Sequence, residues 1–467
     1  MSRPAAGGCP VIGARLLLAL PLVAVAALTL WTVRRRSPLD PGVLLLVTTA
    51  IVGLFYPLAS ALVEPLTWRH GAHLPDEYVL GAQAQFLAFF VGVAGIVAGV
   101  RLTRKPPAPA VRVTAADDDA VAFRDLWIAS GLVIGGGLLY ALYVKQVGLG
   151  PLLDRHNFAE KYRVSSGLGA LYFGLNLVIC GCLWAEASNF SRAARFAFRA
   201  VAAGVCVWSI AFVAVRTYAV ALFLGYVFLA CRRTGFTLAR VRPSLVVALI
   251  VGYAGVEAFA MLRGAWHGSF VDAVATLQRQ PLGVERSLGQ VVGGSELAHP
   301  FLTAMELARF EEPGELAGAS YADAALGLLP LWLNPDRPPT PAQEFARRHY
   351  PSLEARGGGT AFSVVGEAWW NFGPLLGPFA IGLLLAWLLA RVEGRAEAVP
   401  HSYLARFQPY LVHMIVLLHR GSAVSIAKHL FSLLIPALLL AASAHLVWEA
   451  LAARRAQGRG RFSPLHG

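Results

Sequence analysis

Residues 366–373 read Gly366-Glu367-Ala368-Trp369-Trp370-Asn371-Phe372-Gly373, and they close a long polar insertion that begins at Arg263. Most of the chain before Arg263 and after Gly373 consists of apolar runs long enough to be membrane helices. Charged, aromatic, Pro and Gly residues gather in the insertion between them. We therefore expect any chemistry to take place in this insertion, with the remaining helices as its scaffold.

The composition is typical of an integral membrane protein. Of the 467 residues, 57% are hydrophobic and 14% are charged, whereas soluble domains carry about 25% charged residues. We attribute much of the formal net charge of +13 to topology, because cytoplasmic loops collect arginine. Four of the five cysteines lie in apolar runs, which argues against a disulfide framework or a zinc site.

The apolar runs predict an all-α polytopic membrane protein with about eleven transmembrane helices and one large extracytoplasmic loop that contains short helices. A single helix from Phe196 to Cys231 would be about 54 Å long, so we expect a break near Val215-Arg216-Thr217. The predicted spans are residues 12–33, 42–63, 79–100, 126–146, 167–187, 196–214, 217–231, 243–262, 369–390, 404–420 and 429–450.

The distribution of arginine predicts the orientation of the chain. Arg-rich segments fall on every second connection between the spans and include the tail that carries Arg454 and Arg455. By the positive-inside rule these connections are cytoplasmic, so the amino terminus and the insertion are extracytoplasmic. The predicted organisation is a bundle of about eight helices (1–262), an extracytoplasmic loop region (263–366), C-terminal helices (367–452) and a basic cytoplasmic tail (453–467).

Several arginines lie on the extracytoplasmic side, against this preference. Arg216 and Arg263 stand at predicted helix ends with little acid beside them, and Arg347 and Arg348 lie in the insertion. The planar guanidinium group binds phosphate through two parallel hydrogen bonds and stays charged, which suits a pyrophosphate clamp. For the insertion arginines the alternative is pairing with nearby acids such as Glu344.

Glu367 is the candidate general base. It lies just before or at the start of the predicted span 369–390, and an apolar boundary raises the pKa of a carboxyl group. The alternative is that Glu367 only complements a helix dipole and that the adjacent tryptophans only mark membrane depth. Neither a Gly-Lys pair nor a His-Glu-x-x-His motif occurs, so an ATP-driven pump is disfavoured and no metal or cofactor is expected.

Together, the many spans, the late outer loop and the segment 366–373 resemble the Wzy-type O-antigen or oligosaccharide repeat-unit polymerases. Val215-Arg216-Thr217, Leu262-Arg263-Gly264 and the stretch from Ser320-Tyr321 to Pro330 add to the resemblance. One departure is Val215, where a small or hydroxyl residue is expected.

The resemblance implies a metal-independent, inverting glycosyl transfer at the outer face of a bacterial inner membrane. The substrate would be an undecaprenyl-pyrophosphate-linked oligosaccharide, with a chain-length regulator and a flippase as further partners besides membrane lipids, and no nucleic acid. Arg216 and Arg263 would hold the pyrophosphate, and Glu367 would activate the acceptor hydroxyl. The expected substrate-binding residues are Arg347, Arg348, Tyr321, Trp370, Asn371, Glu296 and His299.

Two alternatives stay open. A ligase or another lipid-linked sugar transferase shares the general architecture, and in that case Asp76 and Glu77 in an earlier outer loop become the acids of interest. A flippase for the same glycan belongs to a different class. Substrate sites of transporters lie near the midplane of the membrane, whereas here the polar residues concentrate in one outer loop, which favours the enzyme.

Overall fold

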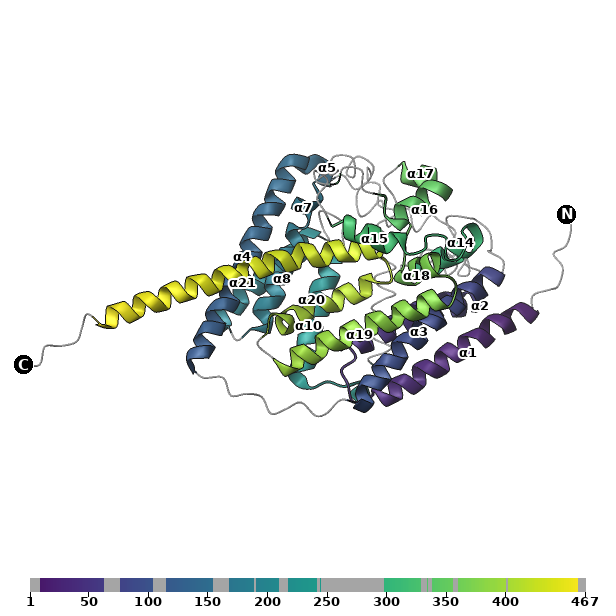
Figure 1. Cartoon of the computed structure of the whole chain (residues 1–467), viewed down its shortest axis with the longest axis horizontal. Coiled ribbons are helices and arrows are strands. Elements are labelled where there is room, and N and C mark those ends of the chain that lie inside the picture. Colours follow the sequence, from purple (N-terminus) through teal and green to yellow (C-terminus); the bar gives the residue numbers. More distant parts are fainter. Residues whose placement is uncertain are drawn as a thin grey trace, which may run out of the picture. The chain divides into compact units, whose positions relative to one another are not determined.

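The computed structural model describes residues 9–62, 76–103, 115–153, 168–188, 190–209, 217–241, 244, 298–328, 334, 338–355, 360–399 and 402–460. Every regular element in these ranges is a helix, which confirms the expected all-α fold (Figure 1). The longer helices are α1 (Cys9–Thr32), α2 (Pro41–Leu62), α3 (Asp76–Thr103), α4 (Ala115–Val147), α8 (Gly174–Ala187), α9 (Arg192–Val207), α10 (Thr217–Thr234), α19 (Leu376–Ala398), α20 (Tyr403–Leu417) and α21 (Ala423–Gly460). The shorter ones are α5 (Leu149–Leu153), α7 (Gly169–Tyr172), the 3-10 turn η2 (Leu238–Arg240), α14 (His299–Phe310), α15 (Ala319–Leu326), α16 (Pro341–His349), α17 (Pro351–Glu354) and α18 (Val364–Phe372).

Five of the described helices are long and apolar enough to cross a membrane, and they indicate an integral membrane protein. Helices α8, α9 and α20 have 14 to 16 residues, fewer than the roughly 20 that a span requires. The predicted span 243–262 lies outside the described residues apart from residue 244. A total of eleven spans therefore stays a prediction. The five candidate spans are Pro41–Ala59, Glu77–Gly99, Val121–Val147, Leu376–Ala398 and Ala423–Leu451.

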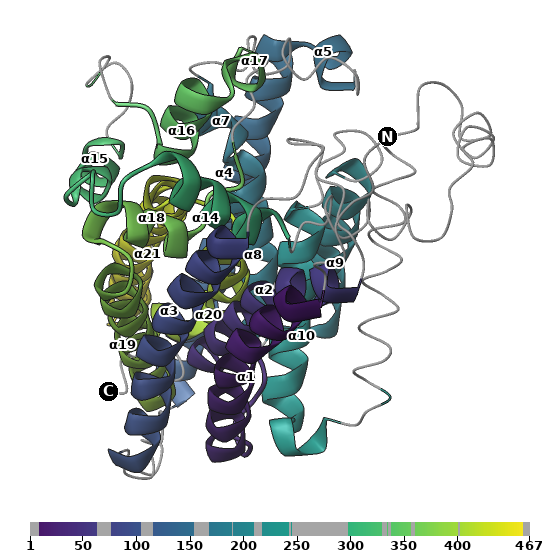
Figure 2. The ribbon, with the colours of Figure 1, turned by 90° about the vertical axis from the view of Figure 1, so that its right-hand side faces the viewer.

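The chain forms two compact units, of which the first comprises residues 1–104, 231–391 and 415–426. In this unit α1, α2 and α3 pack against one another (Figures 1 and 2). Helix α3 also approaches α19 closely, because a Cβ atom on Gly92 would lie 2.3 Å from the carbonyl oxygen of Phe379. A Cβ on Gly382 would likewise lie 2.4 Å from the carbonyl oxygen of Phe89. Glycine at both positions lets the two backbones meet, as in tightly packed membrane helices.

Short helices gather at one end of α2 and α3 in the same unit (Figure 2). Helix α14 packs on α2, α3 and α18, and α18 packs on α3 and α15. The ring of Phe301 stacks on Tyr56 and Phe86, with centroids 5.5 and 5.6 Å apart. Aromatic stacking thus connects α14 to α2 and α3. A separate buried hydrophobic cluster is formed by Leu307, Phe345, Phe362, Trp369 and Trp370.

The second unit comprises residues 105–230, 392–414 and 427–467. Its centre is the pair α4 and α8, where a Cβ on Gly136 would lie 2.5 Å from the carbonyl oxygen of Gly174. Near the start of α4, the buried carboxylate of Asp125 forms ion pairs with Arg124 at 2.9 Å and with Arg406 at 3.0 Å. The long helices of this unit are therefore held by close backbone packing and by a buried ionic cluster.

The helix boundary near Gly373 differs from the sequence-based expectation. The predicted span 369–390 is two helices, because α18 ends at Phe372 and α19 begins at Leu376. Gly373 between them has a φ of +90°, a left-handed conformation that a helix interior does not allow. Hydropathy alone could not place this break, since α18 is as apolar as a span but is buried by protein. Glu367 therefore belongs to a separate short helix.

Candidate functional site

The candidate site is built on α18, whose two ends are fixed by its sequence. The hydroxyl of Ser363 accepts a hydrogen bond from the backbone N–H of Gly366 at 3.1 Å, which caps the start of the helix. Gly373 ends it. Within this helix of nine residues, Glu367 and Asn371 are four residues apart and share a face.

Glu367 connects three segments of the first unit through its carboxylate. Ser320 in α15 donates its hydroxyl hydrogen to Oε1 at 2.7 Å, and the backbone N–H of Ala423 donates to Oε2 at 2.6 Å. Asn371 donates from Nδ2 to the hydroxyl oxygen of Ser320 at 2.8 Å and to the carbonyl oxygen of Glu367 at 2.7 Å. Because Ala423 begins α21, the carboxylate sits at a helix amino terminus, where the backbone carries partial positive charge.

Burial makes Glu367 a proton acceptor that titrates near neutrality. Its exposed fraction is 0%, and among the described residues no basic side chain forms an ion pair with it. Loss of hydration raises the pKa of Glu367 from 4.5 to about 7, although the hydrogen bonds from Ser320 and Ala423 oppose the shift. This is the range that a general base needs.

The hydroxyl of Tyr321 interacts electrostatically with this carboxylate. The ring of Tyr321 stacks on Phe372 with centroids 5.5 Å apart, which holds the side chain in place. Its hydroxyl is buried and forms no hydrogen bond within the described part of the chain. Burial, and then the charge of Glu367, raise the pKa of Tyr321, so the hydroxyl stays protonated. Within electrostatic range of the base there is thus a buried hydrogen-bond donor without a protein acceptor among these residues.

On its other face, α18 carries Trp370, which leads to an ionic network. The indole N–H of Trp370 donates to Glu315 at 3.1 Å, and Arg348 donates to the other oxygen of Glu315 at 2.8 Å. Arg348 also pairs with Glu311 at 3.0 Å and with Glu344 at 2.9 Å. The hydrogen bond from Arg348 is the main cause that lowers the pKa of Glu315 to about 2. The guanidinium of Arg348 is therefore already neutralised by carboxylates.

The structure brings together some of the predicted site residues and leaves others apart. Glu367, Asn371 and Tyr321 form one cluster, and Trp370 and Arg348 form the neighbouring network. Arg347 pairs with Glu344 and is exposed, whereas Trp370 has no exposed surface. His299 begins α14 and is half-buried, and Glu77 near the start of α3 is exposed. Arg216, Arg263 and Glu296 lie outside the described residues.

Three contributors were not assigned a role from the sequence. Ser320 lies 47 positions before Glu367, and the N–H of Ala423 comes from 56 positions after it. Glu315, which fixes both Trp370 and Arg348, lies 55 positions before Trp370. No periodic pattern connects residues this far apart, although Ser320 belongs to the stretch that carries the family resemblance.

No protein-family model, curated protein or solved structure matches the chain. Within the described ranges, no group of three or more His, Cys, Asp or Glu side chains could hold a metal ion.

Proposed function

We propose that the chain polymerises undecaprenyl-pyrophosphate-linked oligosaccharide repeat units at the outer face of a bacterial inner membrane. Under this proposal the chain crosses the membrane about eleven times. The region 263–366 then forms the large extracytoplasmic loop, and the carboxyl terminus is cytoplasmic. The observation that carries the proposal is the buried carboxylate of Glu367, which has a pKa of about 7 and lies outside the candidate membrane spans. The family resemblance of the segment around it supplies the substrate.

The reaction is a displacement at the anomeric carbon of the lipid-linked glycan. The acceptor sugar hydroxyl attacks this carbon from the side opposite the pyrophosphate, so the configuration inverts. The carbon–oxygen bond to the pyrophosphate breaks, and undecaprenyl pyrophosphate leaves with the electron pair. Glu367 takes the proton of the attacking hydroxyl and later releases it to water.

In the described state both oxygens of Glu367 face protein donors. Because each carboxylate oxygen has two lone pairs, the acceptor hydroxyl can approach Oε1 beside the hydroxyl of Ser320. The hydroxyl of Tyr321, which has no acceptor among the described residues, can donate to a sugar oxygen at the same place. Arg216 and Arg263 hold the pyrophosphate in this proposal, since Arg347 and Arg348 are already paired with glutamates.

The test is an assay of the purified protein in lipid with a short lipid-linked repeat unit. A ladder of longer glycans supports polymerisation, and Glu367→Gln should abolish the ladder. Transfer of the glycan to a different lipid acceptor would instead indicate a ligase. Movement of the substrate across the bilayer without a new bond would indicate a flippase and would refute the enzyme.

The proposed topology has a test of its own. Glu312 is exposed in the loop after α14, so Glu312→Cys in a cysteine-free background provides a labelling site. An impermeant maleimide added to intact cells should modify this site before the cells are broken open. Modification only after lysis would place the loop in the cytoplasm, away from the glycan substrate.

A further inference from the structure

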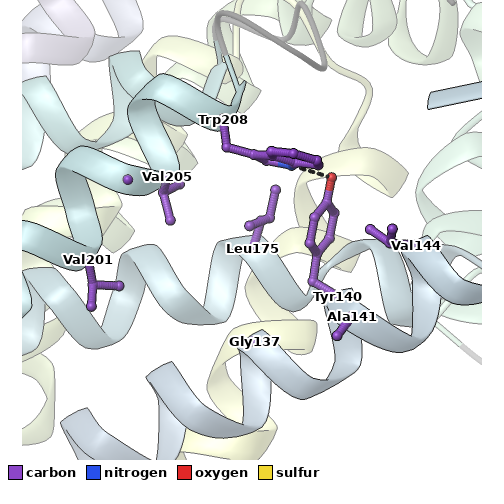
Figure 3. Close-up of a pocket in the computed structure, with 9 residues that line it drawn as sticks. Gly137, Tyr140, Ala141, Val144, Leu175, Val201, Val205 and Trp208 are labelled. Carbon is purple, nitrogen blue, oxygen red and sulfur yellow. Dashed lines mark hydrogen bonds between the residues drawn. The ribbon is translucent and has the colours of Figure 1, made fainter. Parts of the chain in front are cut away.

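An open groove of about 490 Å³ runs between α4, α8 and α9 in the second unit (Figure 3). This volume is within the range of about 300–1,000 Å³ that is usual for ligand sites. Gly137 and Gly204 line the groove, and a Cβ atom on either residue would meet no atom within 4 Å. Most of the remaining lining is aliphatic, so the groove suits a hydrocarbon chain.

The groove opens from a helix surface that is suited to lipid. Helix α4 carries the candidate span Val121–Val147, of which a third is buried. Two of its leucines beside the groove residues, Leu138 and Leu142, are 62% and 48% exposed. Apolar side chains this exposed on a spanning helix face the lipid tails. A hydrocarbon chain can therefore enter the groove from the surrounding bilayer.

Two polar side chains, Tyr140 and Trp208, line the groove together with the apolar residues. The indole N–H of Trp208 donates to the hydroxyl oxygen of Tyr140 at 3.0 Å, as the dashed line in Figure 3 marks. The hydroxyl hydrogen of Tyr140 is then left for an acceptor, since it has no partner among the described residues. Tyr and Trp are typical of the depth at which lipid headgroups begin. Lys145 is exposed and lies one helical turn beyond Ala141, a groove residue, on the same face of α4.

We propose that this groove binds one acyl chain of an anionic phospholipid from the surrounding bilayer. An ester or phosphate oxygen of the lipid accepts the hydrogen bond from Tyr140, and Lys145 pairs with the phosphate. Along α4, Tyr140 lies between the groove residues Gly137 and Val144, and Lys145 directly follows Val144, so the cation lies beyond the apolar lining as a headgroup lies beyond its tail. The proposal concerns the second unit and does not depend on the proposed glycosyl transfer.

The test is photolabelling of the full-length protein in nanodiscs. The probe is a phosphatidylglycerol with a diazirine in one acyl chain, and mass spectrometry locates the labelled peptides. Wild-type protein should be labelled in α4, α8 and α9 around the groove. Gly137→Leu and Gly204→Leu should each abolish this labelling, because the new side chain fills the groove.

Gly135→Leu is the matched control. Gly135 lies on the same helix, also has no atom near its Cβ position, and does not line the groove. Its labelling should equal that of the wild type. Circular dichroism and gel filtration check that each variant folds, and the two groove-filling variants on different helices guard against the failure of one. Equal labelling of Gly137→Leu and wild type would overturn the proposal.

Two further variants test the headgroup contacts. Tyr140→Phe should weaken labelling roughly two- to tenfold, the effect of one hydrogen bond. Lys145→Ala should lower the preference for phosphatidylglycerol over a matched phosphatidylcholine probe about fivefold, as expected for one lysine at an anionic surface. Preferential labelling by a polyprenyl phosphate probe would overturn the phospholipid as the occupant.

Discussion

Replacing Glu367 with glutamine removes a buried charge and keeps the shape of the side chain. Burial raises the pKa of Glu367 from 4.5 to about 7 in the folded protein, and one pKa unit corresponds to about 1.36 kcal/mol. The ionised carboxylate therefore destabilises the folded state by about 3 kcal/mol at pH 8. Between pH 4.5 and about 7 the folded state holds a proton that the unfolded state has released. The free energy of unfolding of the wild type therefore falls as the pH rises through this window, and it levels off above pH 7.

Glutamine can satisfy the same hydrogen-bond partners. Its side-chain oxygen can accept from the N–H of Ala423, and its amide nitrogen can donate to the hydroxyl oxygen of Ser320. Glu367→Gln should therefore unfold at a higher temperature than the wild type at pH 8, by a few degrees. The advantage should disappear near pH 5. Glu367→Ala is the control, because it loses both hydrogen bonds and leaves a cavity, so it should be less stable at either pH.

The assay is thermal unfolding in detergent, followed by tryptophan fluorescence at several pH values. A Glu367→Gln variant that is less stable than the wild type at pH 8, or a difference that does not change with pH, would refute the account of a desolvated carboxylate. Ser320→Ala removes a hydrogen bond that lowers the pKa of Glu367. Ser320→Ala should therefore raise the pKa of Glu367, and the window over which stability falls should extend to higher pH than in the wild type.

The same variant separates structure from catalysis. If Glu367 is the general base, glutamine should reduce the rate of glycan polymerisation about 10²–10⁴-fold while the protein becomes more stable at pH 8. Loss of function with a gain of stability is typical of residues kept for chemistry. In the wild type the rate should rise as the pH increases through 7, because the base must be ionised. Full activity of Glu367→Gln would leave the carboxylate with only the role of holding the start of α21.

Two further predictions concern the surroundings of the site. Arg348→Ala should lower the free energy of unfolding by about 1 kcal/mol near pH 7, the scale of partly exposed ion pairs. The difference from the wild type should shrink as the pH falls from 4.5 to about 2, because the lowered pKa of Glu315 contributes stability only while that group is ionised. Thermal unfolding at several pH values measures this difference. Gly92→Ala should lower the unfolding temperature, because its methyl group meets the backbone of α19. Gly95→Ala on the same helix has open space and should leave the unfolding temperature unchanged. A Gly92→Ala variant with the unfolding temperature of the wild type would argue against the close packing of α3 and α19.

The fold class was predictable because it depends on composition along the chain. Runs of apolar residues require helices in a membrane, since every backbone polar group must be paired within the segment. What hydropathy cannot separate is a helix buried by lipid from one buried by protein. The predicted span 369–390 began too early for this reason, because α18 packs on α3, α14 and α15 and only α19 is a candidate span. Gly373 permits the positive φ that ends α18, but glycines also lie inside the candidate spans, so a glycine alone does not locate the break.

The candidate site was predictable only where its signals are local. Glu367 could be identified because it is a carboxylate beside tryptophans at an apolar boundary. The pairing of Arg347 with Glu344 could also be anticipated, because the two residues are three positions apart. The partners of Glu367 come from positions 320 and 423, and no helical or strand periodicity reaches that far. Burial could be anticipated from the sequence, but the number of hydrogen bonds to the carboxylate could not. That number sets how far the pKa rises, and hence whether the group is charged at neutral pH.

The hydroxyl of Ser320 can stay hydrogen-bonded to Glu367 whether Glu367 is ionised or protonated. When Glu367 is ionised, the hydroxyl of Ser320 donates to it and accepts from Asn371. When Glu367 holds a proton, Oε1 becomes a donor, and the second lone pair of the same hydroxyl can accept that bond. The N–H of Ala423 keeps its acceptor Oε2 in both states. A proton can therefore arrive and leave without breaking the contacts among α15, α18 and α21. The general base proposed here gains and loses a proton in every turnover, and such a base requires a hydrogen-bond partner that fits both of its protonation states.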